Sequence, residues 1–205
     1  KGLKNKNRHP LCGKPLIEWS FLQAKQSKII EEVFVSTDDQ KIIELSRKYD
    51  VKSIKRPMHL AGDNVSSESA LIHAIDKIKK TYNIDPEIIV FLQATSPLRK
   101  KNDIDDAISK FVNKSADSLF SVTSFDDLTL WQRNKDKWAS INFDYKNRLR
   151  RQDMPLNYIE NGSIYIFKKE ILEKFKNRIG GKIISYDMDF WQTWELDTIE
   201  EVDLI

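Results

Sequence analysis

The chain has 205 residues, of which 40% are hydrophobic, 32% charged and 10% aromatic, a composition typical of one soluble globular domain. Its single cysteine excludes a fold built on internal disulfide bonds. The longest purely apolar run, 88–92, is far shorter than the roughly 20 residues that cross a bilayer. A net charge of +3 is too small for a protein that binds nucleic acid mainly through its charge. We therefore expect one domain over 1–205, with no nucleic-acid or membrane partner.

Hydrophobic periodicity along the chain alternates between the helical and the strand type, which predicts an α/β fold. The spacing of about 30 residues between strands is typical of parallel crossover units, so we expect a mostly parallel sheet with helices on both faces. Helices are expected at about 15–27, 38–49, 66–78, 102–112 and 168–176, the second capped by Asp38, and strands at 33–35, 51–54, 87–92, 119–122, 162–167 and 182–186.

Two regions depart from this pattern. Residues 125–160 have weak periodicity and are rich in Trp, Arg, Asn and Asp, which predicts an excursion outside the main sheet. At the amino end, a basic loop feeds a helix directly, although such a loop normally follows a strand that fixes its direction. We therefore expect a strand and the first part of the loop to precede Lys1.

Charge is concentrated with opposite sign at the two ends. Residues 1–14 contain five basic residues and no acid, whereas 187–205 contain seven acidic residues and no Lys or Arg. The two ends would suit a polyphosphate and its metal ion, but a pair of solvated termini would look the same. Segment 1–7 precedes a helix whose amino end attracts phosphate, and its alternative interpretation is a flexible basic tail.

The loop after the best strand carries Gln93, Thr95, Ser96 and Arg99. In open α/β sheets ligands bind beyond the carboxyl ends of strands, so we expect these side chains to meet one. A structural turn built on Ser-Pro is the alternative.

Two further groups of charged residues suggest ligand binding. Glu195 and Asp197 would face the same side of a strand and bind one hard cation, unless Asp197 caps a helix that begins near Thr198. An arginine cluster at 148–151 would grip a carboxylate, or else form a solvated loop or an oligomer contact.

Taken together, these segments resemble the cytidylyltransferases that activate acylneuraminate and other nonulosonate sugars. The likeness covers nearly the whole chain in order, and it rests on 1–7, 56–57 with 66–67, 92–99 as its most specific part, 161–165 and 195–198. The resemblance implies a Rossmann-like nucleotide-diphospho-sugar transferase fold. It also implies a cytoplasmic homodimer that couples CTP to a 2-keto sugar acid, giving a CMP-sugar and pyrophosphate, with 125–160 as its dimerisation excursion. A small satellite core is the alternative for that excursion.

The resemblance also assigns roles residue by residue. The implied catalytic residues are Lys6, Glu195 and Asp197; the nucleotide-binding residues are Lys1, Lys6, Asn7, Arg56 and Ser67; the sugar-binding residues are Gln93, Ser96, Tyr165 and, reaching across a dimer, Arg151; the ligands of Mg²⁺ (or Mn²⁺) are Glu195 and Asp197. Because such chemistry needs no Ser-His or Cys-His pair, Cys12 is expected to be a small buried side chain.

Two departures from the family pattern concern the substrate. Glu195 stands where the family usually has Asp, and Ile159-Glu160 stands where some sialic acid synthetases have a second carboxylate-binding arginine. The sugar acid is therefore open at this stage. A transferase for 3-deoxy-manno-octulosonate and a non-catalytic nucleotide-sugar binding protein are the two alternative functions.

Overall fold

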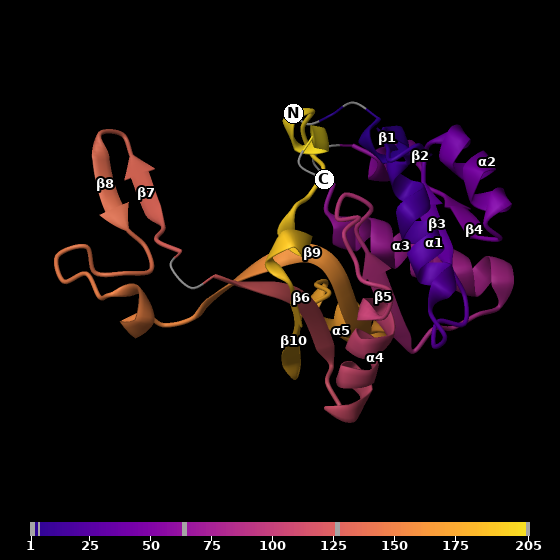
Figure 1. Cartoon of the computed structure of the whole chain (residues 1–205). Coiled ribbons are helices and arrows are strands. Elements are labelled where there is room, and N and C mark those ends of the chain that lie inside the picture. Colours follow the sequence, from indigo (N-terminus) through magenta and orange to yellow (C-terminus); the bar gives the residue numbers. More distant parts are fainter. Residues whose placement is uncertain (1–2, 4, 63–64, 126–127, 204–205) are drawn as a thin grey trace.

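The computed structural model describes residues 3, 5–62, 65–125 and 128–203, so Lys1 lies outside the described residues. Its central sheet has the strand order β10 (Ile183–Met188), β6 (Ser118–Phe125), β9 (Asn157–Lys168) and β5 (Ile88–Leu92) (Figure 1). β10 and β6 are parallel, and β9 is antiparallel to both β6 and β5. Three of these four strands thus point the same way, which confirms the mostly parallel sheet.

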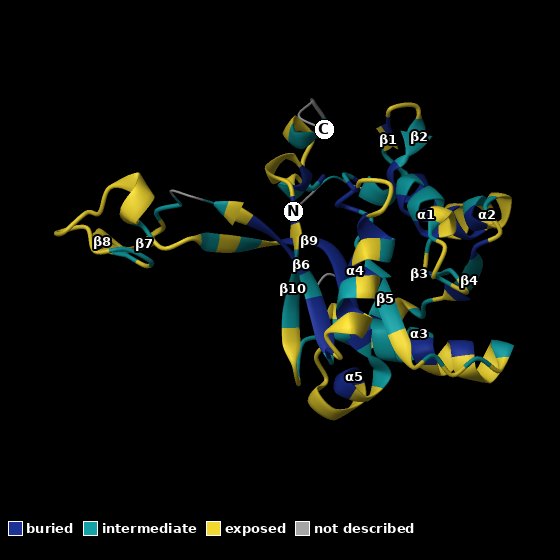
Figure 2. Ribbon diagram, turned by 60° about the horizontal axis from the view of Figure 1, so that its bottom comes forward, coloured by how far each residue is buried: buried dark blue, intermediate teal, exposed yellow. Residues whose placement is uncertain are grey.

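Helices cover both faces of this sheet. Successive side chains of β9 point to opposite faces, so each face presents apolar side chains against which a helix packs. Ile164 and Ile166 pack against α4 (Asp103–Asn113) on one face. Tyr165 and Phe167 pack on the other face, against α3 (Ser67–Tyr82) and α5 (Lys169–Phe175). Figure 2 shows the buried residues concentrated along β6 and β9. The predicted α/β fold with helices on both faces is confirmed.

The amino-terminal part adds a parallel pair, β3 (Phe34–Thr37) and β4 (Lys52–Lys55), with α1 (Leu16–Gln26) and α2 (Gln40–Lys48). Their shared core includes Phe21, Val35 and Ile42. Asp39 caps α2, since its carboxylate accepts the Lys41 N–H at 2.8 Å. The expected cap at Asp38 was wrong by one residue, because the sequence does not show which of the two neighbouring aspartates takes the extended backbone.

A short hairpin joins β1 (Pro10–Leu11) to β2 (Lys14–Pro15) ahead of α1. Its two turn residues, Cys12 and Gly13, have φ angles of 48° and 79°, as a two-residue hairpin turn requires. Cys12 is exposed at this turn. The prediction that it would be buried was wrong because the turn points its side chain away from the core.

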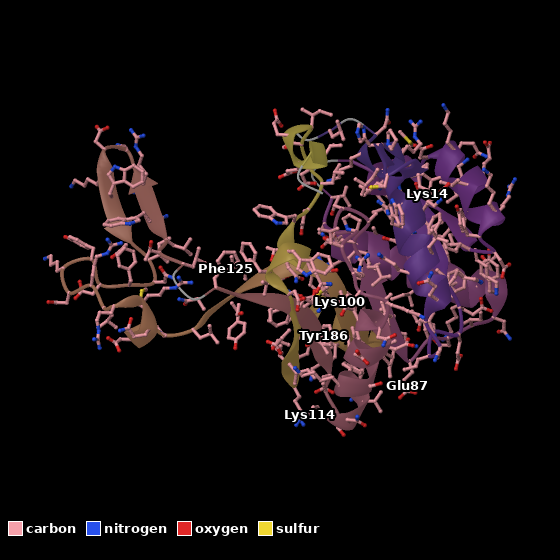
Figure 3. The ribbon with its side chains drawn as sticks, in the orientation of Figure 1. Lys14, Glu87, Lys100, Lys114, Phe125 and Tyr186 are labelled. Atoms are coloured by element: carbon pink, nitrogen blue, oxygen red, sulfur yellow. The ribbon has the colours of Figure 1, made fainter. Side chains whose placement is uncertain are left out.

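An arm, defined here as residues 128–156, leaves the body between β6 and β9 (Figure 1). Figure 3 shows Phe125 at its root. The arm contains an antiparallel hairpin of β7 (Trp131–Asn134) and β8 (Lys137–Ser140), in which every residue of β7 is exposed. The Trp131 ring contacts those of Phe143 and Tyr145, at centroid distances of 5.3 and 5.6 Å. The arm therefore has a small aromatic cluster of its own and lies outside the main sheet.

Candidate active site

The loop after β5 is folded tightly against the body. Thr95, Ser96 and Arg99 are all buried, and the Leu196 N–H donates to the Thr95 carbonyl at 2.8 Å. Gln93, at the carboxyl end of β5, is half-buried. The loop thus joins the end of a central strand to the acidic carboxyl-terminal segment.

β9 carries a wide bulge next to this loop. Tyr165 pairs with Phe120 but Glu160 pairs with Val122, so five steps along β9 span two steps along β6. Ser121 fastens the bulge: its hydroxyl donates to Asn161 Oδ1 at 2.5 Å and accepts the Ile164 N–H at 2.8 Å. Bulges of this kind re-aim the chain beside functional sites.

Gly162 lies at the tip of the bulge, with a φ of +67° that disfavours any side chain. A Cβ atom there would lie 2.1 Å from Glu195 Oε1 and 3.2 Å from Gln93 Nε2. The motif around Asn161 and Gly162 therefore lets bare backbone approach two side chains that the sequence singled out.

The segment with the two carboxylates is extended but pairs with no strand. Leu196 is fully buried between them. The Asp197 carboxylate accepts from Lys6 Nζ at 2.5 Å, and its carbonyl accepts the Leu3 N–H at 2.7 Å. The oppositely charged ends of the chain thus meet here rather than standing apart in solvent.

Asp197 is not a helix cap. Glu201 Oε2 accepts the N–H groups of Asp197 and Thr198, at 2.6 and 2.7 Å, and the short 3₁₀ helix that follows covers Glu200–Asp203. The expectation of a strand under Glu195 was also wrong. Burial of Leu196 and these loop hydrogen bonds set the direction of the two carboxylates instead.

Burial raises the pKa of Glu195, and the charge of Asp197 raises it further, while the Ser96 hydroxyl opposes the rise. Ser96 Oγ nevertheless meets no partner with full hydrogen-bond geometry. Two close carboxylates, one of them partly desolvated, favour a cation between them. Since the described residues hold no group of three or more His, Cys, Asp or Glu suited to a metal, further ligands would have to come from a substrate or water.

A buried network anchors the approach to this segment. Gln192, in the 3₁₀ helix Phe190–Thr193, donates to Asp103 Oδ2 at 2.6 Å and to the Leu98 carbonyl at 3.0 Å. Tyr186 of β10 also donates to Asp103, at 3.1 Å, and Lys100 forms an ion pair with Asp189 at 2.6 Å. Lys100 and Tyr186 are labelled in Figure 3. The loop after β5 and the carboxylate segment are thereby tied to one helix end.

The expected nucleotide side is more open. Lys6 and Asn7 belong to the 3₁₀ helix Lys6–Arg8, which an ion pair of 2.6 Å between Arg8 Nε and Asp39 Oδ2 fastens to the amino end of α2. An open pocket of about 250 Å³ lies here, lined by Leu3, Asn5, Lys6, Asn7, Arg8, Thr37, Asp38, Asp39 and Ile42.

The other two expected nucleotide residues follow β4. Arg56 donates from Nη2 to the Ser36 carbonyl at 2.6 Å and from Nε to Ser36 Oγ at 3.2 Å. Ser67 is the exposed first residue of α3, directly after the N-cap Ser66. Among the described residues, no hydrogen bond or ion pair joins either of them to Lys6 or Asp197, so the structure does not bring them into one cluster with these two.

Tyr165, expected in the sugar pocket, is only 5% exposed. Its hydroxyl donates to Glu160 Oε1 at 2.5 Å, and burial followed by this hydrogen bond raises its pKa. The Arg178 guanidinium lies 4.6 Å from the Tyr165 ring centroid and pairs with Glu68 at 2.9 Å. Arg178 was not predicted, because it lies in a polar loop after α5 with no local motif.

Two arginines of the expected ligand-binding segments lie in opposite environments. Arg99 is 7% exposed, and its guanidinium donates to the side chains of Ser20 and Gln23 and to the carbonyls of Gln93 and Ser163; that it also meets a ligand stays a prediction. Arg151 is exposed, in the 3₁₀ helix Arg151–Asp153. It lines a hollow of about 360 Å³ with Gln152, Met154 and Leu156, on an arm that extends away from the body (Figure 1).

Comparison with known proteins places the chain in a family. A family model described as cytidylyltransferase matches residues 1–204. The chain is 32% identical over 195 residues to N-acylneuraminate cytidylyltransferase of Oncorhynchus mykiss, covering 92% of this chain and 43% of that protein. It is 33% identical over 169 residues to pseudaminic acid cytidylyltransferase of Campylobacter jejuni, covering 80% of this chain and 72% of that protein.

A solved structure shows the same fold. CMP:2-keto-3-deoxy-manno-octonic acid synthetase complexed with CTP superposes with a TM-score of 0.70 at 14% identity, covering 99% of this chain and 90% of that one. Within the described residues, no helix has the length and apolar character needed to cross a membrane. The family model spans almost the whole chain, so the chain belongs to the cytidylyltransferase family.

Proposed function

We propose that the protein transfers the CMP group of CTP to a 2-keto sugar acid of the nonulosonate class. The observation that carries this proposal is the meeting of three segments at the carboxyl end of β5. Lys6 contacts Asp197 there, while Glu195 and Gln93 both adjoin the bare backbone of Gly162. Joining a triphosphate to a second substrate requires a cation that binds phosphate, carboxylates that hold a metal ion, and a polar side chain that orients the second substrate. Lys6, the pair Glu195 and Asp197, and Gln93 would supply these.

The nucleotide would bind on the open side. Lys6 and Asn7 line the 250 Å³ pocket and would hold the triphosphate and the cytidine, while Arg56 and Ser67 would contact the base. The Arg56 guanidinium is already oriented by Ser36, so less conformational freedom is lost when it binds.

Glu195 and Asp197 would hold Mg²⁺ or Mn²⁺, because carboxylate oxygens are the ligands these hard cations prefer and the pair lacks only ligands that phosphate and water can supply. Such a cation would neutralise charge on the phosphates. Lys6 would then exchange the Asp197 carboxylate for a phosphate oxygen of CTP bound in the same cluster of charges.

The reaction needs little covalent work from the protein. An oxygen–phosphorus bond forms between the anomeric hydroxyl and the α-phosphorus of CTP, the bond from that phosphorus to the bridging oxygen breaks, pyrophosphate leaves, and the hydroxyl proton passes to solvent. Gln93 would orient the sugar acid, supported by Ser96 and Tyr165 at the buried side of the site. Catalysis then comes from positioning and charge neutralisation.

We further propose that the active form is a cytoplasmic homodimer. Arg151 would grip the sugar carboxylate, yet it lies on an arm that extends away from its own body (Figure 1). The arm also exposes large apolar side chains, including Trp138, Ile141 and Leu149, whose burial against a second copy would be favourable. Each site would then combine the body of one copy with the arm of its partner.

The test is a pyrophosphate-release assay with CTP, Mg²⁺ and a panel of N-acetylneuraminate, pseudaminate and 3-deoxy-manno-octulosonate. We expect turnover of a nonulosonate above the octulosonate. The octulosonate turning over fastest would contradict the proposed substrate class. CTP binding by calorimetry without pyrophosphate release from any acid would instead indicate a nucleotide-sugar binding protein. Absence of CTP binding would refute the nucleotide site itself.

A further inference from the structure

Arg99 is a buried cation that joins three elements of the body. Its Nη1 donates to Gln23 Oε1 of α1 at 2.9 Å and, more weakly, to Ser20 Oγ at 3.4 Å. Its Nη2 donates to two carbonyl oxygens, those of Gln93 at 2.8 Å and Ser163 at 2.7 Å. One guanidinium thus connects α1, the end of β5 and the bulge of β9.

The two carbonyls on Nη2 have a particular place in the sheet. The ladder between β5 and β9 ends with the pair Leu92 and Ile164. Gln93 and Ser163 are the next residues outward on the two strands, where backbone hydrogen bonds between them stop. Arg99 donates hydrogen bonds to both of these carbonyls. It therefore sets the distance between the two strands beyond their last backbone pair.

That separation determines the geometry of the candidate site. Gln93 carries the side chain expected to orient the sugar acid, and Gly162 precedes Ser163 at the bulge tip. The Gln93 amide and the Glu195 carboxylate both adjoin Gly162. A change of an ångström in the spacing of the Gln93 and Ser163 backbones would shift these two side chains relative to each other.

Stability alone is a poor reason for this arginine. Burial lowers the pKa of Arg99 to about 9, and the charge of Asp103 offsets that only partly. Arg99 Nε has no hydrogen-bond partner among the described residues. Taking a cation out of water is costly, and apolar residues of similar volume commonly fill such positions at least as stably.

We propose that Arg99 is a positioning residue, which sets the spacing between Gln93 and the β9 bulge and so places the sugar acid for attack on CTP. This inference rests on the proposed function for its kinetic readout. Arg99 touches no substrate in this account. It acts through the backbone of Gln93 and Ser163, whereas the expected nucleotide contacts of Lys6, Asn7 and Arg56 lie outside its reach.

The test compares Arg99→Lys with the unmodified chain, using the acid of the panel that the unmodified chain turns over fastest. Lysine keeps a cation but cannot bridge two carbonyls and Gln23 at once. We expect kcat/KM for the acid to fall by roughly 100-fold, mainly through a higher KM. We expect the Kd for CTP to change by less than about twofold, since no nucleotide contact is lost.

Gln23→Met is the second variant, and it keeps the test open where Arg99→Lys fails to fold. It removes one acceptor of Arg99 and the bond from Gln23 Nε2 to the Pro97 carbonyl at 2.7 Å. We expect the same rise in KM for the acid, at roughly tenfold, with unchanged CTP binding. Phe111→Leu is the control, because Phe111 of α4 is 2% exposed and belongs to the same core cluster as Ile164, but makes none of the hydrogen bonds of Arg99.

Hydrogen exchange of the backbone amides separates this inference from the proposed function. Faster exchange at 93–96 and 162–164 in the Arg99 and Gln23 variants, but not in Phe111→Leu, would support the positioning role even with no acid turned over. Unchanged exchange in these segments would overturn it. So would a lower kcat with both KM values unchanged, because that pattern reflects only fewer folded molecules.

Discussion

The body and the arm are built in opposite ways. In the body, Leu196 and the loop after β5 are buried and cross-linked by backbone hydrogen bonds, which fixes the positions of Glu195 and Asp197. In the arm, every residue of β7 is exposed, and the side chains pack mainly on one another, as in the aromatic cluster around Trp131. One copy of the chain thus brings the expected residues Lys6, Glu195 and Asp197 together in its body, whereas the expected residue Arg151 lies on the arm.

The strongest test of the body's part is Asp197→Asn. Its carboxylate contacts Lys6, so its loss removes a cation ligand and a charge partner together. We expect turnover to fall by roughly 10³-fold with little loss of stability. Steady-state pyrophosphate release measures the fall, and thermal unfolding checks the fold. Asp187→Asn is the matched control, since within the described part of the chain Asp187 forms its ion pair with Lys110, at the surface and at 3.2 Å. Equal losses in the two variants would contradict the assignment.

The arm is tested by mixing two inactive variants. Arg151→Ala should lower kcat/KM for the sugar acid by roughly 50-fold while leaving CTP binding unchanged, because a bidentate contact to a carboxylate is lost. When the Arg151→Ala and Asp197→Asn variants are refolded together in equal amounts, the mixture should recover about a quarter of the unmodified activity. Half of the dimers are then mixed, and each mixed dimer has one intact site.

Arg133→Ala is the control for this mixing experiment. Arg133 also lies on the arm, where its guanidinium stacks on Trp138 at 5.7 Å. It should retain full activity by itself. Failure of the mixture to recover activity, with dimers present by size-exclusion chromatography, would show that each copy completes its own site.

Local patterns predicted much of the fold. The strand expected at 87–92 and the helix expected at 66–78 follow from spacing that neighbouring residues determine, and the structure confirms both, as β5 and as α3 with its N-cap at Ser66. The reversed direction of β9 was not predicted, because strand direction depends on pairing with distant partners rather than on the 161–165 motif itself.

The site was predicted less evenly. Opposite charge at the two ends left open whether they meet or stand apart in solvent, and the contact of Lys6 with Asp197 decides for a meeting. The role of Arg99 was not anticipated, because its position after a strand does not tell whether a long side chain turns outward or folds back onto carbonyls. The contact of Arg178 with Tyr165 joins residues on two different elements, and no local signal reveals it.

The close approach of Glu195 to the β9 bulge is tested by comparing Gly162→Ala with Gly13→Ala. Both glycines have a positive φ, but a Cβ at Gly13 meets nothing within 4 Å whereas one at Gly162 collides with Glu195. Alanine should cost about 1 kcal/mol at either position because of φ alone. Only Gly162→Ala should also lower turnover, by about tenfold, as Glu195 is displaced. Urea unfolding and kcat/KM measure the two effects, and equal turnover in both variants would refute the close approach.

The smallest expected effect concerns the stability of the body as a function of pH. The pKa of Glu195 in the folded state is raised, chiefly by burial. The contribution of Glu195 to the free energy of unfolding is therefore fully present below its unfolded-state pKa and is lost as pH rises through its folded-state pKa. With a chelator present to remove divalent cations, Glu195→Gln should therefore unfold at a higher temperature than the unmodified chain at pH 7. The difference in unfolding temperature should shrink toward pH 4. Glu44→Gln is the exposed control. A gain that does not depend on pH would show that the burial of the Glu195 charge is not its source.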